Sequence, residues 1–172
     1  MLHTERLVLR RVALEDAEDI YNGWARDGEV TRYLTWKPHE SVEITRKVVE
    51  MRLEDYKKPD CARYVIALAG TKNPIGMIDV VGFKDGCPVI GYVLGREHHN
   101  KGYMTEALGA FIKELFKRGY PALLIEADER NSASNRVIEK CGFKFTGKET
   151  KLCSKAKQKM ITVNWYRLEP GE

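Results

Sequence analysis

Apolar residues follow a helical period in three parts of the chain. Residues 103–118 carry them at spacings of three and four, which predicts an amphipathic helix whose core-facing stripe is Ala107, Leu108, Phe111, Ile112, Leu115 and Phe116. A partial stripe predicts a helix from the N-cap Ser41 to about Lys57, with Pro59 beyond its end. Residues 14–25 (LEDAEDIYNGWA) begin with carboxylates, which stabilise a helix N-terminus, so an earlier helix is predicted there.

Between these helices the chain carries short runs of β-branched and aromatic residues, which predict strands. The first contains Leu7 and Leu9 in alternation with Val8 and Arg10. The others are residues 63–69, 76–81, 89–94, 122–128, 145–152 and 160–168, with the turn-forming TKNP between the first two of these. This mixture predicts an α/β (α+β) fold with a mixed sheet. Because no linker or repeat interrupts it, residues 1–172 are predicted to form a single domain.

The passage from strand 89–94 to helix 103–118 predicts an anion-binding loop. Gly102 directly precedes the helix, where backbone N–H groups lack intrahelical acceptors and lie at the positive end of the helix dipole. A glycine before a helix also occurs for steric reasons alone. The next segment strengthens the prediction, since strand 122–128 leads into a short helix that Asn131 or Ser132 caps and that Gly142 ends in a left-handed conformation.

Composition narrows the classes of function. The chain has 29 basic and 25 acidic residues and a net charge of +4. This charge suits an anionic ligand, is too mild to predict nucleic-acid binding, and equally fits an ordinary surface. The four cysteines form no CxxC pair and no histidine stands at metal-ligand spacing, so we expect reduced thiols and no metal. A charged N-terminal segment and short apolar stretches predict a cytoplasmic protein without a membrane partner.

Five segments together resemble one known family. They are TERLVLRR at residues 4–11, IGMIDV at 75–80, IGYVL at 90–94, NKGYMTEAL at 100–108 and NSASNRVIEKCGF at 131–143. In this order they resemble the GNAT N-acetyltransferases, and most closely the branch of ribosomal-protein N-terminal (RimJ/RimL-like) acetyltransferases. The resemblance implies a mostly antiparallel sheet of about six to seven strands, flanked by helices, in which one splayed strand pair holds coenzyme A.

The resemblance also implies acetyl-CoA as co-substrate. Backbone N–H groups of the loop and of Thr105 would hold the pyrophosphate, and the loop pattern of the family, Arg/Gln-x-x-Gly-x-Gly/Ala, falls on His99, Asn100, Lys101, Gly102, Tyr103 and Met104. His99 replaces the usual Arg or Gln, and Met104 replaces a small residue, which leaves a contact from the His99 side chain open. The pantetheine arm would lie between two groups of residues: Tyr92, Val93 and Leu94, and opposite them Asn131, Ser134, Asn135 and Arg136.

The implied reaction is direct attack of a primary amine on the thioester in a ternary complex. The Leu94 N–H would stabilise the oxyanion. The usual acidic tyrosine of the family is replaced by Ile138, so Ser134 is the next candidate, although it equally fits a first-turn residue bonding the helix backbone. The usual glutamate before Ile-Gly-Tyr is replaced by Val89. Glu126 and Asp79 remain as candidate bases, each with a structural alternative, and an acceptor of low pKa needs little help.

The acceptor is expected to contact aromatic residues in the region of the first two helices. Trp24, Tyr33 and Trp36 are the candidates, with helix packing as their alternative role. A protein N-terminal amine, a polyamine-like metabolite or an amine-bearing antibiotic would each fit, and the protein is expected to be a monomer or a homodimer. A second hypothesis is a catalytically silent CoA-binding regulatory or scaffold domain, because the usual acid and base positions hold Ile138 and Val89.

Overall fold

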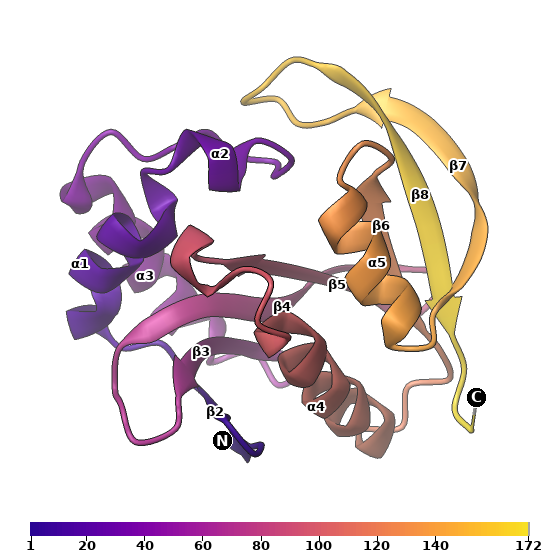
Figure 1. Cartoon of the computed structure of the whole chain (residues 1–172), viewed down its shortest axis with the longest axis horizontal. Helices are drawn as coiled ribbons and strands as arrows, with labels where there is room; N and C mark the ends of the chain where they lie inside the picture. The colour runs from indigo at the N-terminus through magenta and orange to yellow at the C-terminus, as the bar shows by residue number, and fades with distance from the viewer. Residues whose placement is uncertain (172) are drawn as a thin grey trace.

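The computed structural model describes residues 1–171, and one twisted sheet runs through them (Figure 1). Its strand order is β1-β2-β3-β4-β5-β6-β8-β7, and every neighbouring pair is antiparallel except β5 and β6. The strands are β1 (Leu2–His3), β2 (Leu7–Arg10), β3 (Arg63–Leu68), β4 (Pro74–Lys84), β5 (Cys87–Leu94), β6 (Leu123–Asp128), β7 (Lys144–Leu152) and β8 (Met160–Leu168). The predicted fold is confirmed. The sheet has eight strands because the two-residue β1 is too short to leave a sequence pattern.

The helical segments lie near their predicted positions. They are η1 (Leu14–Asp16), α1 (Ala17–Ile20), η2 (Tyr21–Ala25), α2 (Gly28–Thr31), α3 (Val42–Asp55), η3 (Arg96–His98), α4 (Tyr103–Lys117) and α5 (Ser132–Lys140). The prediction of one regular helix over residues 14–25 is wrong in detail, since this stretch passes from a 3-10 turn through a short α-helix into a π-helical turn. The π-helical turn contains Asn22 and Gly23, both weak helix formers, so tertiary packing decides its geometry.

Local capping follows the sequence. The Ser41 hydroxyl accepts a hydrogen bond from the Ile44 N–H, and the Asn131 side-chain oxygen accepts one from the Ser134 N–H at 3.2 Å. Gly142 has a φ of 89° just past the end of α5, as predicted for a left-handed closing residue. Asn131, rather than Ser132, is therefore the N-cap of α5.

The two faces of the sheet bury different helices. On one face α4 and α5 pack over the main core, to which β3, β4 and β5 contribute Ile66, Ile78 and Ile90. The neighbouring residues Val65 and Met77 point to the other face, where α1 and α3 cover them. This alternation assigns the side chains of β5 to the two faces: Tyr92 and Leu94 pack with the main core, and Val93 packs with the α1 and α3 side.

The parallel pair β5 and β6 separates after two residue pairs. Val89 is paired with Leu124 and Ile90 with Ile125, whereas β5 continues to Leu94 in contact with β4 alone. The edge of β5 that faces β6 is therefore unpaired from Gly91 onward, which confirms the predicted splay. No helix within residues 1–171 is long and apolar enough to cross a membrane.

Candidate functional site

A cavity of about 950 Å³ lies where β5 and β6 diverge. The end of β5, the loop into α4, the first turn of α5, the segment around α2 and α3, and the β7–β8 hairpin all contribute to its wall. The structure brings most of the predicted site residues together in this wall: Trp24, Tyr33, Trp36, Asp79, Tyr92, Val93, Leu94, His99, Asn100, Gly102, Tyr103, Met104, Thr105, Glu126, Asn131, Ser134 and Arg136.

Two predicted cofactor contacts do not line this cavity. The Asn135 side chain is buried and fully engaged inside the protein: its amide nitrogen donates to Asp128 O and Asn131 O, and its oxygen accepts from Asn164 and Tyr166. Asn135 therefore ties α5 to the sheet. Lys101 is exposed, and its carbonyl accepts a hydrogen bond from Arg6 at 2.9 Å.

The loop into α4 has the backbone shape of an anion site. Asn100 and Gly102 have φ values of 60° and 78°, both in the left-handed region. Gly102 is the N-cap of α4 and lacks a side chain that would satisfy the first N–H groups of the helix. A Cβ at Gly102 would lie 3.3 Å from Arg6 Nη2, so glycine meets both a conformational and a steric demand.

An ion pair from the N-terminal segment holds this loop in place. Glu106, in the first turn of α4, accepts from Arg6 Nε at 2.7 Å, from the Arg6 N–H at 2.8 Å and from Thr4 Oγ1 at 2.6 Å. Burial opposes the charged form of Glu106, yet the hydrogen bonds from Thr4 and Arg6 outweigh it and lower the pKa of this carboxyl. In the sequence, Thr4, Glu5 and Arg6 serve only as part of a family motif, and no local pattern predicts their contact with the loop.

The two residues that depart from the family loop pattern, His99 and Met104, have other contacts in the structure. His99 Nε2 donates to the carbonyl of Leu94 at 2.8 Å, so its ring ties the loop to the end of β5. The Met104 side chain is buried in the main core and therefore leaves the loop open despite its size. Neither side chain is needed for a loop that binds an anion through backbone N–H groups.

Tyr92 and Ser134 meet across the gap between β5 and α5. The two hydroxyl oxygens lie 2.8 Å apart, and the Tyr92 hydroxyl also donates to Ser134 O at 3.3 Å. Burial raises the pKa of Tyr92, with the hydrogen bond from Ser134 a smaller opposing effect, so the phenol is protonated at neutral pH. The family pattern places its acidic phenol at the position of Ile138, so the sequence does not predict a proton-donating role for Tyr92. The period-two alternation from Ile90 to Tyr92 is the signal that locates this phenol.

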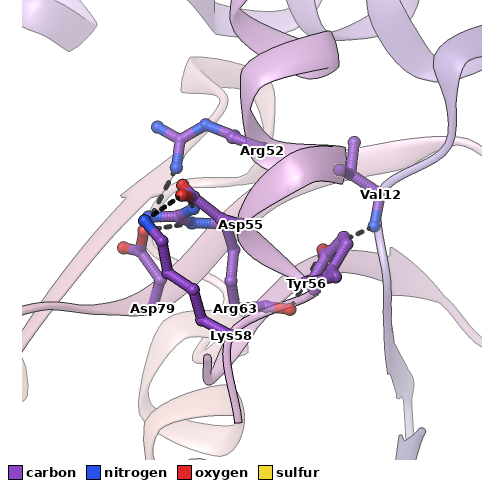
Figure 2. A network of polar contacts seen from close by, with 7 residues as sticks. All are labelled: Val12, Arg52, Asp55, Tyr56, Lys58, Arg63 and Asp79. Atoms are coloured by element: carbon purple, nitrogen blue, oxygen red, sulfur yellow. Dashed lines mark hydrogen bonds and ion pairs between the residues drawn. The ribbon is translucent and has the colours of Figure 1, made fainter. Parts of the chain in front are cut away.

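The two candidate carboxylates are both paired with cations. Asp79 is 8% exposed, and its Oδ2 accepts from Arg63 Nε at 2.8 Å and from Arg52 Nη1 at 3.2 Å (Figure 2). Glu126 forms an ion pair with Lys151 of β7. Asp79 thus joins α3 to β3 and β4, which supports a structural role for this residue. The Glu126 side chain is more exposed to solvent than that of Asp79.

The three aromatic candidates differ in how far their side chains are exposed at the cavity wall. Trp24 is 1% exposed and belongs to the core beneath α1 and α3. The guanidinium groups of Arg32 and Arg130 lie 5.3 and 5.8 Å from the ring centroid of Tyr33. Trp36 packs against His39 with ring centroids 5.1 Å apart. Trp24 is therefore mainly a packing residue, while Tyr33 and Trp36 are half-buried at the wall.

His39 is a cavity residue for which the sequence predicts no role. Its Nδ1 lies 2.7 Å from Oγ1 of the buried Thr45. Burial, and to a lesser degree the charge of Arg52, lowers the pKa of His39, so the ring is neutral at pH 7. Its position after the aromatic segment 33–36 was the available signal.

The β7–β8 hairpin contributes Lys151, Cys153, Ile161 and Val163 to the cavity wall. In Figure 1 this long hairpin reaches toward α2. Lys157 Nζ, at its tip, donates to Thr31 O at 2.6 Å and to Arg32 O at 3.2 Å. Among residues 1–171, no group of three or more His, Cys, Asp or Glu side chains is arranged to hold a metal ion.

Comparison with known proteins identifies relatives of similar length and fold. The pattern of the acetyltransferase (GNAT) domain matches residues 6–144. An uncharacterized N-acetyltransferase of Bacillus licheniformis, p20, is 31% identical over 174 residues, which cover 97% of this chain and 94% of the relative.

Two solved structures extend the comparison. A GNAT-family acetyltransferase from Bacillus anthracis has a TM-score of 0.84 at 25% identity, with 99% of each chain covered. RimL, a ribosomal alpha-N-protein acetyltransferase in complex with coenzyme A, has a TM-score of 0.83 at 22% identity, with 96% of this chain and 95% of RimL covered. At that identity the likeness to RimL shows a shared fold.

Proposed function

Because the chain belongs to the acetyltransferase (GNAT) family, we propose that it transfers the acetyl group of acetyl-CoA to a primary amine by direct attack in a ternary complex. One observation carries the proposal. The gap between β5 and β6 has a left-handed glycine loop at one end and the Tyr92–Ser134 hydroxyl pair on its wall. An anionic tail and a thioester would thus find separate, suitable partners in one cavity.

The backbone of the loop and of β5 would bind the co-substrate. N–H groups of Gly102, Tyr103, Met104 and Thr105 lack intrahelical acceptors and suit a pyrophosphate. The unpaired edge of β5 after Ile90 suits the amides of a pantetheine arm, as an added strand would. The fold match to RimL, whose structure contains coenzyme A, supports this assignment.

Three groups of the chain would act on the reacting atoms. The Leu94 N–H would stabilise the negative charge on the thioester oxygen while the bond from the amine nitrogen to carbon forms. As the carbon–sulfur bond breaks, the Ser134 hydroxyl would give its proton to the sulfur and take the proton of the Tyr92 hydroxyl beside it, and solvent would then return a proton to Tyr92. The proton lost by the amine would pass to water or to Glu126, which lines the same cavity.

The acceptor is proposed to be a protein N-terminal amine or a small-molecule amine. It would enter between Trp36, Tyr33 and the β7–β8 hairpin, on the side of the sheet that α1 and α3 cover. RimL is named for acetylation of a ribosomal protein, which supports the first class of acceptor. The competing function is a CoA-binding regulatory domain, which Val89 and Ile138 at the usual base and acid positions favour.

A thiol-release assay separates these functions. Acetyl-CoA is mixed with peptides that have free N-termini, with polyamines and with aminoglycosides, beside the variants Ser134→Ala and Glu126→Gln. Release of the free thiol with one class of acceptor, with slower release by Ser134→Ala, supports acetyl transfer and identifies the class of substrate. Tight binding of acetyl-CoA with no release across the panel contradicts acetyl transfer to these acceptors and favours the regulatory domain.

A further inference from the structure

Arg52, on α3, is a cationic cavity residue with few partners. Its side chain is 26% exposed and lines the cavity. Within residues 1–171 its only hydrogen bond runs from Nη1 to Asp79 Oδ2, at 3.2 Å. Arg63, by contrast, donates from Nε to Asp79 at 2.8 Å and from Nη1 to Asp55 at 2.6 Å. Since a guanidinium has five N–H donors, Arg52 is left with most of its donors unused.

Figure 2 shows the network of ion pairs around Arg52. Asp55 is shared by Arg63 and Lys58, and Asp79 is shared by Arg63 and Arg52. Arg63 therefore contacts both carboxylates, whereas Arg52 contacts only Asp79, at 3.2 Å, the longest of the four ion pairs. Of the two arginines in this network that line the cavity, Arg52 is the one whose charge the carboxylates neutralise less.

The lowered pKa of Arg52 agrees with its single contact to a carboxylate. Burial lowers the pKa of Arg52, and the attraction of Asp79 does not make up for it. A guanidinium nonetheless stays protonated in proteins. The charge of Arg52 also reaches His39, where it contributes to the lowered pKa of that ring.

Arg52 lies on the side of the sheet where an acceptor would approach. Its partner Asp79 is opposite Gly91 of β5, and a Cβ at Gly91 would lie 3.8 Å from Asp79 Oδ1. Leu94, whose N–H is the proposed oxyanion contact, lies three positions after Gly91 on β5. At the rise of a strand this is about 10 Å.

We propose that Arg52 binds an oxyanion, a carboxylate or a phosphate, that the acceptor carries about 10 Å from its reactive amine. This inference rests on the proposed acetyl transfer and adds the chemical class of the acceptor. A guanidinium binds either oxyanion through two parallel N–H donors, which Arg52 has free. The acceptor would then be held at both ends, with its anion at Arg52 and its amine near Leu94.

Matched pairs of acceptors test this assignment by kinetics. The carboxylate pair is triglycine and triglycinamide, and the phosphate pair is aminohexyl phosphate and aminohexanol, all of which hold the two groups roughly 10 Å apart when extended. The variants are Arg52→Gln and Arg52→Lys. Lys47→Gln is the control, because Lys47 is exposed on the same helix and does not line the cavity.

We expect the wild-type protein to prefer the anionic member of at least one pair. Arg52→Gln lowers kcat/KM for that compound about 10- to 100-fold, the usual effect of losing hydrogen bonds to a charged group, and leaves the neutral member nearly unchanged. For the same compound, kcat/KM of Arg52→Lys lies between the values of the wild type and Arg52→Gln, and kcat/KM of Lys47→Gln equals that of the wild type. Equal use of both members of each pair, or a preference that survives Arg52→Gln, overturns the inference. A purely structural Arg52 would reduce both members equally.

A binding measurement keeps this inference separate from the proposed function. The CoA-loaded protein is titrated calorimetrically with N-acetyltriglycine and its amide, and with N-acetylaminohexyl phosphate and N-acetylaminohexanol. Binding of an anionic product alone, abolished in Arg52→Gln, supports the anion site even if no amine is turned over. Turnover without selective binding or anion preference overturns the anion site and leaves acetyl transfer standing. Absence of selective binding together with absence of turnover counts against both.

Discussion

The hydroxyl oxygen of Tyr92, on β5, lies 2.8 Å from that of Ser134, in the first turn of α5. Ser134 has its N–H bonded to the cap residue Asn131, so its hydroxyl is not needed to cap the helix. The pair places two protonated oxygens in the wall of the proposed thioester site, where a leaving thiolate needs a proton.

A double-mutant cycle tests whether the two hydroxyls act together. We expect Ser134→Ala to lower kcat about 100-fold and Tyr92→Phe about 10-fold, both within the usual range for acid–base groups. The double variant should be no worse than Ser134→Ala alone, because residues that act as one unit are not additive. Steady-state kinetics at saturating acetyl-CoA measures this, and Tyr64→Phe, in the core and outside the cavity, is the control. Fully additive losses would contradict a shared role.

A pair of glycine substitutions in and before α4 tests the anion loop. Gly102→Ala forces a side chain into a left-handed conformation against Arg6, so we expect a cost of about 1–3 kcal/mol and weaker binding of coenzyme A. Gly109→Ala, in the same helix and with nothing within 4 Å, should instead stabilise the protein by about 0.5–1 kcal/mol. Urea unfolding and calorimetric titration with coenzyme A measure both. A Gly102→Ala protein that binds coenzyme A as well as Gly109→Ala would remove the loop from the binding site.

Acid should weaken the contact of Glu106 with the N-terminal segment. The pKa of this carboxyl is lowered below its ordinary value of 4.5 in the folded protein. The unfolded chain therefore binds more protons, and the stabilisation is present above that value and is lost as the pH falls through the folded pKa. We expect wild-type stability to fall more steeply than that of Glu106→Gln between about pH 5 and about pH 3.

Urea unfolding across this pH range measures the difference. Glu50→Gln is the control, because Glu50 is exposed on α3. Parallel pH profiles for the wild type and Glu106→Gln would contradict the lowered pKa.

Asp79→Asn separates a structural aspartate from a catalytic one. The variant leaves Arg63 and Arg52 without their shared buried carboxylate, so we expect a loss of about 3 kcal/mol in the free energy of unfolding. Activity toward a neutral acceptor, measured per folded molecule, should stay within about threefold, since Asp79 Oδ2 is already taken by two guanidinium groups. An Asp79→Asn protein of normal stability and greatly reduced kcat would make Asp79 the base.

The sequence predicts most of the fold because its strongest patterns are local. The stripe on α4 is wide, and the helix ends within one residue of the predicted boundary. Ser41, Asn131 and Gly142 cap their helices by interactions within a few residues, which sequence patterns report well.

The contacts that the sequence does not predict have a different physical origin, because they join segments that are distant along the chain. Arg6 reaches Glu106 across one hundred positions of the chain. Tyr92 meets Ser134, and Arg52 meets Asp79, only after the sheet and its helices have assembled. The family resemblance implies that Asn135 contacts coenzyme A together with its neighbours Ser134 and Arg136, whereas the helical turn directs its side chain into the protein interior.

The most direct test is a crystal structure of the protein with bound coenzyme A. We predict the pyrophosphate at the N–H groups of Gly102 to Thr105, the pantetheine amides paired with the open edge of β5, and the thiol sulfur within hydrogen-bond reach of Ser134 Oγ. Coenzyme A bound elsewhere, or a sulfur far from both Ser134 and Leu94, would contradict acetyl transfer in this cavity.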